Sequence, residues 1–247
     1  MKIAIVGYGV EGRSNYRYYQ AKYPEAEIVI FDERAQLDDT PEGAQLVLGG
    51  RAFAQVKGFD LVLRSPSVAP DRIKQADHHW SATREFLRQS PAPIIGVTGS
   101  KGKGTTCSLI ASILRQHLAG RPERHVHLLG NIGVPALDVL PSVGEDDIVV
   151  YELSSFQLWD CTQSPTIAVV TMIEPDHLNV HRDYRDYVQA KLHILDYQHD
   201  GDTAVYNQSD SESAELIGHI VASTQADDLP YPYRKGAHFD EQYLYMG

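Results

Sequence analysis

Short apolar runs alternate with helix-sized stretches along most of the chain. The runs have the length of buried strands and cover residues Lys2–Val6, Glu27–Phe31, Leu61–Leu63, Ile94–Val97, Ile148–Tyr151, Ile167–Ile173 and Thr203–Tyr206. Between several of them lie stretches long enough for helices, such as Glu11–Tyr23 and Thr105–His117. Short strands separated by helices are typical of an α/β fold with a mainly parallel sheet. We therefore predict an α/β protein.

The pattern starts again near residue 90. Ser90-Pro91-Ala92-Pro93 is a proline-rich break, and a new strand with a new glycine-rich loop follows it directly. Such breaks are typical of domain boundaries, so we predict one domain over residues 1–90 and a second over residues 91–247. Near the end, Leu229-Pro230-Tyr231-Pro232-Tyr233 interrupts the pattern, and residues 236–246 resemble a short hairpin. Because the chain stops in mid-pattern, we expect it to be a fragment.

The composition of the chain excludes several classes of binding partner. The 247 residues include 22 Lys and Arg against 33 Asp and Glu, a net charge of −11. Surfaces that bind nucleic acid are basic, so we expect no nucleic-acid partner. No apolar run approaches the ~18 residues of a membrane-spanning helix or, at the start, the roughly 7–15 residues of a signal-peptide core. Cys107 and Cys161 lie among periodic apolar residues, as reduced buried thiols do. We expect a cytoplasmic, monomeric protein without a membrane partner.

The first glycine-rich loop follows the first predicted strand and opens a helix. Its sequence is Gly7-Tyr8-Gly9-Val10-Glu11-Gly12, and Asp32 follows Gly12 by twenty residues at the end of the second strand. This context favours a dinucleotide or another diphosphate at the helix N-terminus, with the acid near a ribose. Three interpretations stay open: an NAD-type site, a nucleotide-sugar site, and glycines that only let strand and helix pack closely.

The second glycine-rich loop is more specific. It runs Thr98-Gly99-Ser100-Lys101-Gly102-Lys103-Gly104-Thr105-Thr106 after the strand Ile94–Val97. Its N–H groups suit phosphates, Lys103 suits the β- and γ-phosphate oxygens, and a threonine hydroxyl at the helix start suits Mg²⁺. The loop departs from the strict P-loop pattern, because Val97 replaces the first glycine and Gly104 follows the lysine. A flexible turn without a ligand is the alternative.

Lys191 is unusual for its place in a predicted helix over residues 183–197. It shares one helix face with Tyr184, Tyr187, Val188 and Leu195, at a spacing of three and four residues. That face points toward the core, and a buried lysine needs a partner or a special role.

Five ordered motifs resemble the Mur ligase superfamily: Thr98–Thr106, Gly130-Asn131-Ile132-Gly133, Glu152-Leu153-Ser154-Ser155-Phe156-Gln157-Leu158, Asp176-His177-Leu178 and Ala190-Lys191. The stretch 152–158 is most similar to the branch that adds D-glutamate to UDP-N-acetylmuramoyl-L-alanine. The resemblance implies a Rossmann-like domain that binds the UDP sugar, followed by a P-loop-type ATPase domain with a mainly parallel sheet, truncated here. It also implies a reaction in which ATP phosphorylates the substrate carboxylate and the amine of D-glutamate attacks the acyl phosphate.

The resemblance assigns residues to each part of that reaction, with ATP and Mg²⁺ as cofactors. Phosphate binding falls to Gly99, Ser100, Lys101, Gly102, Lys103, Gly104, Thr105 and Thr106. The catalytic residues are Lys103, Glu152, His177 and Lys191, and the metal ligands are Thr105, Glu152, His177 and Lys191, the lysine in carbamylated form. Met172 and Asn179 depart from the family pattern around His177. Substrate contacts fall to Gly9, Val10, Glu11, Gly12, Ser14, Asp32, Arg34, Ser65, Asn131 and Ser154.

Other functions stay open at this point. Lys103-Gly104-Thr105 with Cys107 also resembles the folylpolyglutamate synthase branch, but that branch lacks a domain like residues 1–90. Another Mur ligase, or a non-catalytic module that binds nucleotide and UDP sugar, are further alternatives. The third domain of the family, which brings D-glutamate, has no counterpart before Gly247.

Overall fold

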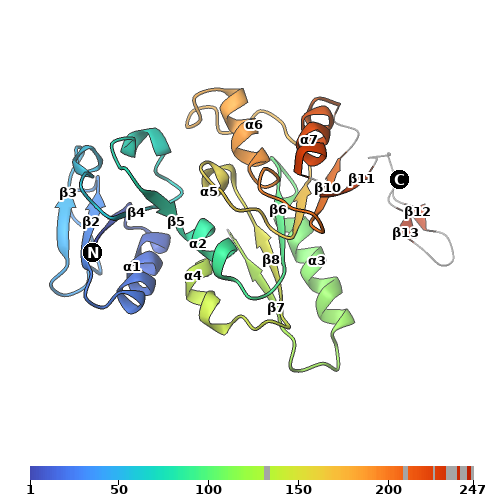
Figure 1. Ribbon diagram of the computed structural model, residues 1–247, viewed down its shortest axis with the longest axis horizontal. Helices are drawn as coiled ribbons and strands as arrows, with labels where there is room; N and C mark the ends of the chain where they lie inside the picture. The colour runs from blue at the N-terminus through green and yellow to red at the C-terminus, as the bar shows by residue number, and fades with distance from the viewer. Residues whose placement is uncertain (131–133, 208–210, 225, 232–237, 240–243, 246–247) are drawn as a thin grey trace. The chain divides into compact units, whose positions relative to one another are not determined.

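The computed structural model describes residues 1–130, 134–207, 211–224, 226–231, 238–239 and 244–245 (Figure 1). The chain forms two compact units. Unit 1 comprises residues 1–89 together with 134–142, and unit 2 comprises residues 90–133 and 143–247. The segment 134–142, which the sequence places in the second domain, therefore groups with the first unit.

Unit 1 is built on a parallel sheet with the strand order β3-β2-β1-β4-β5. Its strands are β1 (Lys2–Val6), β2 (Glu27–Asp32), β3 (Gln45–Leu48), β4 (Leu61–Arg64) and β5 (His79–Ser81). Its helices are α1 (Val10–Lys22), α2 (Ala82–Gln89) and α4 (Ala136–Val139), with 3-10 turns η1 (Phe53–Gln55), η2 (Pro70–Ile73) and η3 (Leu140–Ser142). The order reverses between β1 and β4, and the first glycine loop follows β1 at this switch point, where ligands bind in such sheets.

Alternation along the strands of unit 1 divides its core between the two faces of the sheet. Val6, Phe31 and Val62 lie in one buried cluster with Phe53 of η1 and Ile73 of η2. The intervening strand residues, such as Ile5 and Ile30, are fully buried on the opposite side of the pleat. Strands buried on both faces are nearly continuous apolar runs, and that is why the sequence revealed them.

Unit 2 is built on a second parallel sheet with the order β11-β10-β9-β6-β8-β7. Its strands are β6 (Ile94–Thr98), β7 (Val126–Leu129), β8 (Ile148–Glu152), β9 (Ile167–Val170), β10 (Thr203–Asn207) and β11 (Asp227–Tyr231). Its helices are α3 (Lys103–His117), α5 (Ser155–Leu158), α6 (Tyr184–Leu192) and α7 (Ser211–Thr224). A separate antiparallel pair joins β12 (His238–Phe239) to β13 (Leu244–Tyr245).

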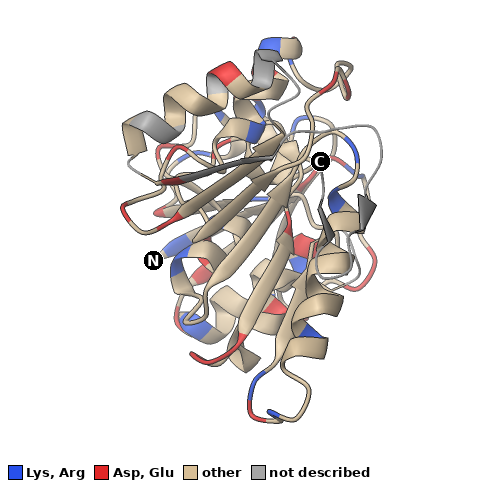
Figure 2. Cartoon of the chain, turned by 90° about the vertical axis from the view of Figure 1, so that its right-hand side faces the viewer, with Lys and Arg blue, Asp and Glu red and all other residues tan. Residues whose placement is uncertain are grey.

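The core of unit 2 lies between α3 and the sheet. Cys107 and Ala111 of α3 pack against Val97, Val150 and Val169 of the three central strands. Figure 2 shows these strands mostly without charged residues, which lie on helices, loops and strand ends. Cys107 and Cys161 are both buried, reduced thiols, as the sequence predicted.

The α/β prediction with parallel sheets is confirmed, and several bounds change. The predicted strand Ile167–Ile173 ends at Val170, and the helix predicted over 183–197 covers Tyr184–Leu192. The stretch Leu229–Tyr233, predicted to end the helical pattern, follows the end of α7 at Thr224, and its first residues belong to β11, which pairs with β10. Among the residues that the structure describes, no helix has the length and apolarity needed to cross a membrane.

Candidate active site

The second glycine loop joins β6 to α3 at the carboxyl edge of the sheet. Gly102 adopts a left-handed conformation at the N-cap of α3, with φ of +83°. The Lys103 ammonium folds back onto the loop, where Nζ donates to the carbonyl oxygens of Gly99 at 2.9 Å and Ser100 at 3.3 Å. The start of a 15-residue helix thus lies beside a loop with a lysine turned inward. This arrangement suits an anion.

Lys191 reaches the same loop from α6. Its side chain is buried, and Nζ donates to the Gly99 carbonyl oxygen at 2.7 Å and lies 4.6 Å from the ring centre of Tyr187. Burial, together with the charge of Lys103, lowers the pKa of Lys191 from 10.5 to about 7. Near neutral pH a large share of the Lys191 amine is therefore uncharged and nucleophilic.

Tyr187, which the sequence did not single out as a site residue, fixes the loop from the same helix. Its hydroxyl lies 2.7 Å from Ser100 Oγ. Ser100 Oγ also donates to the Glu174 carbonyl oxygen and accepts from the Glu174 N–H, both at 2.8 Å. Two neighbouring turns of α6 therefore hold consecutive loop residues, Gly99 through Lys191 and Ser100 through Tyr187.

Glu152 ends β8 opposite Val97 of β6, so its carboxylate lies beside the glycine loop. A Cβ atom at Gly104 would come 3.3 Å from Glu152 Oε2, which shows that the carboxylate faces the first turn of α3. A serine or threonine at position 104, as in the strict P-loop, would crowd this carboxylate. The charge of Glu152 also affects Cys107. Burial is the main cause and the Glu152 charge the second cause that raise the pKa of the Cys107 thiol to about 12.

A buried polar cluster joins α5 to α6. His181 Nε2 lies 3.0 Å from Ser155 Oγ, and His181 Nδ1 lies 3.0 Å from Asp186 Oδ2. The imidazole stacks on Phe156 and contacts Trp159, with ring centres 5.3 and 4.2 Å away. Burial lowers the pKa of His181, which keeps the ring neutral near pH 7. No local pattern in the sequence marks His181, because its partners lie in other elements.

His177 lies near this cluster but faces solvent. It is a non-glycine residue in the left-handed region, with φ of +52°, a conformation that costs about 1 kcal/mol or more. Its ring centre lies 5.0 Å from that of Phe156, and its side chain is about half exposed. Residues held in such conformations cluster at active and ligand-binding sites.

The remaining predicted residues of unit 2 differ in position. Ser154 is the N-cap of α5 and forms a capping box with Gln157, so its side chain has a structural role whether or not it binds a substrate. Thr105 is exposed on the first turn of α3. Lys101 is exposed and pairs with Glu174 at 3.3 Å. Asn131 lies outside the described residues.

The donor set around the glycine loop fits Mg²⁺ only in part. Glu152 supplies a carboxylate, and the threonine hydroxyls of α3 supply hard oxygen ligands of the kind that Mg²⁺ prefers. Lys191 in its amine form is no such ligand. Among the described residues, no group of three or more His, Cys, Asp and Glu side chains converges to hold a metal. A divalent cation at this loop would therefore take its further ligands from waters or from the phosphate oxygens of a bound nucleotide.

The first glycine loop borders a pocket of about 330 Å³ in unit 1. Of the predicted residues, Gly9, Asp32 and Arg34 line it, together with residues that the sequence did not single out: Phe53, Val68 and Arg72. Arg72 lies over the Phe53 ring and pairs with Glu33. Gly12 lies below the loop, where a Cβ atom would come 2.1 Å from the Gly7 carbonyl oxygen, so only glycine lets α1 approach so closely.

Asp32 is fully engaged within the protein. Its carboxylate accepts hydrogen bonds from the Tyr8 N–H at 2.8 Å and from Arg34 Nε and Nη2, each at 2.8 Å. These bonds, above all those from the Arg34 side chain, lower the pKa of Asp32 to about 2. The geometry therefore favours Asp32 as the residue that orients Arg34 rather than as a free acceptor for a ribose.

The other predicted residues of unit 1 have different surroundings. Ser65 Oγ donates to the Gly7 carbonyl oxygen at 2.6 Å, and Ser14 Oγ donates to Asp138 Oδ1 of α4 at 2.9 Å. Val10 is exposed. Burial raises the pKa of Glu11 to about 7, and its Oε1 atom has no partner among the described residues. Ser14 thus points away from the pocket, and Ser65 shapes the loop.

Comparison with known proteins identifies the family to which the chain belongs. The family model of the Mur ligase middle domain matches residues 97–235, more than half of the chain, and the chain belongs to the Mur ligase family. Within that family it is similar to UDP-N-acetylmuramoylalanine--D-glutamate ligase of Clostridium botulinum (strain Kyoto / Type A2), with 33% identity over 249 residues that cover 96% of this chain and 53% of the relative. The protein of the same name from Clostridium acetobutylicum is 32% identical, covering 98% and 54%. The chain spans about half the length of the curated relatives it matches.

A solved structure shares the fold. The crystal structure of UDP-N-acetylmuramate:L-alanyl-gamma-D-glutamyl-meso-diaminopimelate ligase from Neisseria meningitides aligns with a TM-score of 0.52 and 17% identity. The alignment covers 94% of this chain and 77% of that one. It supports the two-sheet architecture without bearing on the substrate.

Proposed function

We propose that the chain carries the nucleotide- and substrate-binding parts of an ATP-dependent ligase that joins D-glutamate to UDP-N-acetylmuramoyl-L-alanine, a step of peptidoglycan precursor synthesis. One observation carries the proposal: Lys103 and Lys191 both donate to the Gly99 carbonyl oxygen, at 2.9 and 2.7 Å. Two ammonium groups on one carbonyl would repel each other, so the pair favours either a neutral Lys191 amine or an anion bound between the two side chains. The names of the similar curated relatives support the choice of substrates.

The loop Gly99–Thr106 would hold the phosphates of ATP. Its N–H groups and the N-terminus of α3 would face the anionic oxygens, and Lys103 would exchange its two carbonyl acceptors for phosphate oxygens. Bound Mg²⁺ would neutralise the phosphates, with Glu152 and Thr105 as its protein ligands and His177 nearby. Transfer of the γ-phosphoryl group from ATP to the substrate carboxylate would give an acyl phosphate and ADP. Attack by the D-glutamate amine would then form the amide and release phosphate and a proton.

Lys191 would act as a carbamate. Addition of CO₂ to its amine forms a C–N bond and releases one proton, and it requires the neutral amine that a pKa of about 7 makes available. The product is an anion close to Lys103, so the repulsion between two cations becomes an attraction. It would also supply the oxygen ligand that the amine lacks.

The pocket beside the first glycine loop would hold the uridine diphosphate part of the substrate. Gly9 lines it next to the N-terminus of α1, where a diphosphate fits, and Arg34 lies at its side, oriented by Asp32. The names of the similar curated relatives favour a nucleotide sugar over a dinucleotide in this pocket.

The proposal is tested by measuring ADP formation with the complete protein that the natural gene encodes. ADP that forms only when UDP-N-acetylmuramoyl-L-alanine and D-glutamate are both present would support it. Turnover with L-lysine, meso-diaminopimelate or a folate in place of D-glutamate would indicate another Mur ligase or a folylpolyglutamate synthase-like enzyme. Binding of ATP and of the UDP sugar without turnover would instead indicate a non-catalytic module.

A further inference from the structure

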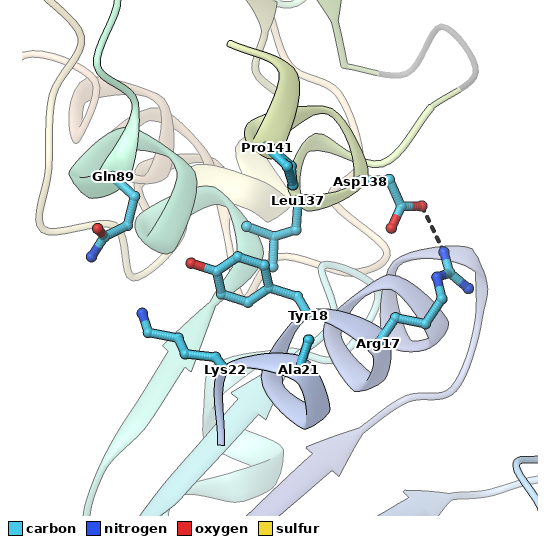
Figure 3. A pocket seen from close by; sticks show the side chains of 8 residues that line it. All are labelled: Arg17, Tyr18, Ala21, Lys22, Gln89, Leu137, Asp138 and Pro141. Atoms are coloured by element: carbon cyan, nitrogen blue, oxygen red, sulfur yellow. Dashed lines mark hydrogen bonds and ion pairs between the residues drawn. The ribbon is translucent and has the colours of Figure 1, made fainter. Parts of the chain in front are cut away.

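A second pocket in unit 1 lies between α1, the end of α2 and α4 (Figure 3). Its volume is about 580 Å³, within the ~300–1,000 Å³ typical of sites for small molecules. It shares no lining residue with the pocket beside the first glycine loop. It is therefore a separate candidate site, outside the residues assigned above to ATP and the UDP sugar.

The middle of this pocket is apolar. Tyr18 and Ala21 of α1 line one side, and Leu137 and Pro141 line the other (Figure 3). The Tyr18 ring is held in place, because its hydroxyl donates to the buried carboxylate of Glu85 at 3.1 Å. A flat apolar body could lie against this fixed ring and Leu137 without ordering them first.

Polar groups stand at the two ends of the pocket. Lys22 and Gln89 lie at one end, and Arg17 and Asp138 lie at the other, joined by an ion pair of 2.6 Å (Figure 3). Asp138 also accepts a hydrogen bond from Ser14, so its charge is compensated within the protein. Capacity to donate hydrogen bonds to a ligand therefore lies at the end with Lys22 and Gln89, where an ammonium group and an amide are both donors.

The charge at the Lys22 end favours an anion. Lys22 Nζ lies 2.5 Å from Glu85 Oε1, and Arg88 Nη2 lies 2.8 Å from Glu85 Oε2. One buried carboxylate thus faces two cations, which leaves a positive balance at this end. That balance is opposite in sign to the net charge of the chain, which is −11.

We propose that this pocket binds a small carboxylate with a flat, apolar body. The body would lie between Tyr18 and Leu137, and the carboxylate would accept hydrogen bonds from Lys22 and Gln89. Such a ligand would bridge α1, which begins at the first glycine loop, and α4. The proposal does not depend on the proposed ligase activity.

Calorimetric titration of the 247-residue chain with 2-naphthoate tests it. We expect saturable binding of one molecule per chain, and weaker binding of the uncharged 2-naphthamide. Ala21→Trp fills the pocket from an exposed position and should weaken binding about tenfold or more, and Gln89→Glu, which adds a negative charge, should weaken it about fivefold. The exposed Ala119→Trp and Gln116→Glu are matched controls on α3 and its end, and they should leave the affinity unchanged.

The proposal would be overturned by no saturable binding of 2-naphthoate, by equal affinity of the Ala21→Trp or the Gln89→Glu chain, or by equal affinity for 2-naphthamide. Excess UDP and ATP should not displace 2-naphthoate, and displacement by either would place it in another pocket. Failure of ligase activity leaves all of these outcomes unaffected, so the two proposals are judged separately.

Discussion

His181 Nε2 lies 3.0 Å from Ser155 Oγ, although the two residues are 26 positions apart in the chain. With Asp186 on the other ring nitrogen, the order serine, histidine, aspartate is that of a hydrolytic triad. Ser155 and His181 are only 2% and 3% exposed, so no substrate can reach them. The cluster instead ties α5, which follows the end of β8 at Glu152, to α6, which carries Lys191.

His181→Phe should lower the free energy of unfolding by about 2 kcal/mol or more, because it leaves the buried Ser155 hydroxyl without this partner and removes one of the hydrogen bonds of Asp186, which keeps those from Arg182. Urea denaturation measures this, and a double-mutant cycle with Ser155→Ala should give a coupling of about 1 kcal/mol. His199→Phe is the matched control, since the His199 side chain is 84% exposed. Equal stability of the two phenylalanine variants would contradict the packing described for His181.

Lys103→Met should lower the affinity of the chain for ATP in the presence of Mg²⁺ by about 100-fold, because it removes the ammonium group that the loop itself turns inward. Lys101→Met is the control. It removes an equal charge two residues earlier in the chain, but from a side chain that is exposed, and it should change the affinity by less than about threefold. Calorimetric titration measures both. Equal losses in the two variants would show that the loop attracts nucleotide only through its overall charge.

Lys191 should make stability depend on pH between about 7 and 10.5. Its pKa is about 7 in the folded chain and near the ordinary 10.5 when unfolded. In this range the unfolded state therefore binds more protons, and the free energy of unfolding rises with pH. Lys191→Met removes that contribution, so its stability relative to the unsubstituted chain should be greatest at pH 7 and decline toward pH 10. The comparison uses urea denaturation in CO₂-free buffers, and a difference independent of pH would contradict the lowered pKa.

Arg34→Gln should weaken the binding of UDP to the chain about tenfold, because a neutral side chain replaces a guanidinium at the rim of the pocket. The exposed Arg51→Gln is the control and should bind UDP as the unsubstituted chain does. Titration followed by calorimetry separates the two. Unchanged affinity in the Arg34 variant would remove this residue from the proposed UDP site.

The sequence revealed the central strands and missed those at the sheet edges. β3, β5, β7 and β11 were not predicted, and each is the outermost strand of its sheet. An edge strand has one neighbour and exposed backbone, so it needs fewer apolar residues and tolerates polar residues or a proline. His79 in β5 and Pro230 in β11 are examples. Hydrophobic patterns therefore identify the middle of such a sheet better than its limits.

Candidate site residues were predictable where the chemistry is local. The glycine loops can be recognised in the sequence alone, because the strand, the glycines and the helix follow one another within a few residues. Lys191 was also recognisable, since a lysine on an apolar helix face is anomalous. Tyr187 and His181 were not, because their roles arise from partners in distant segments, Ser100 for one and Ser155 for the other.

The grouping of residues 134–142 with unit 1 affects how this protein can be divided or recombined. The backbone passes from one unit to the other at 89/90, returns at 133/134 and leaves again at 142/143. A gene cut at position 90 would deprive α1 of Asp138, the partner of Ser14 and Arg17. The two units are therefore not interchangeable cassettes, and a functional chimera between related ligases would have to carry α4 with the helix it packs against.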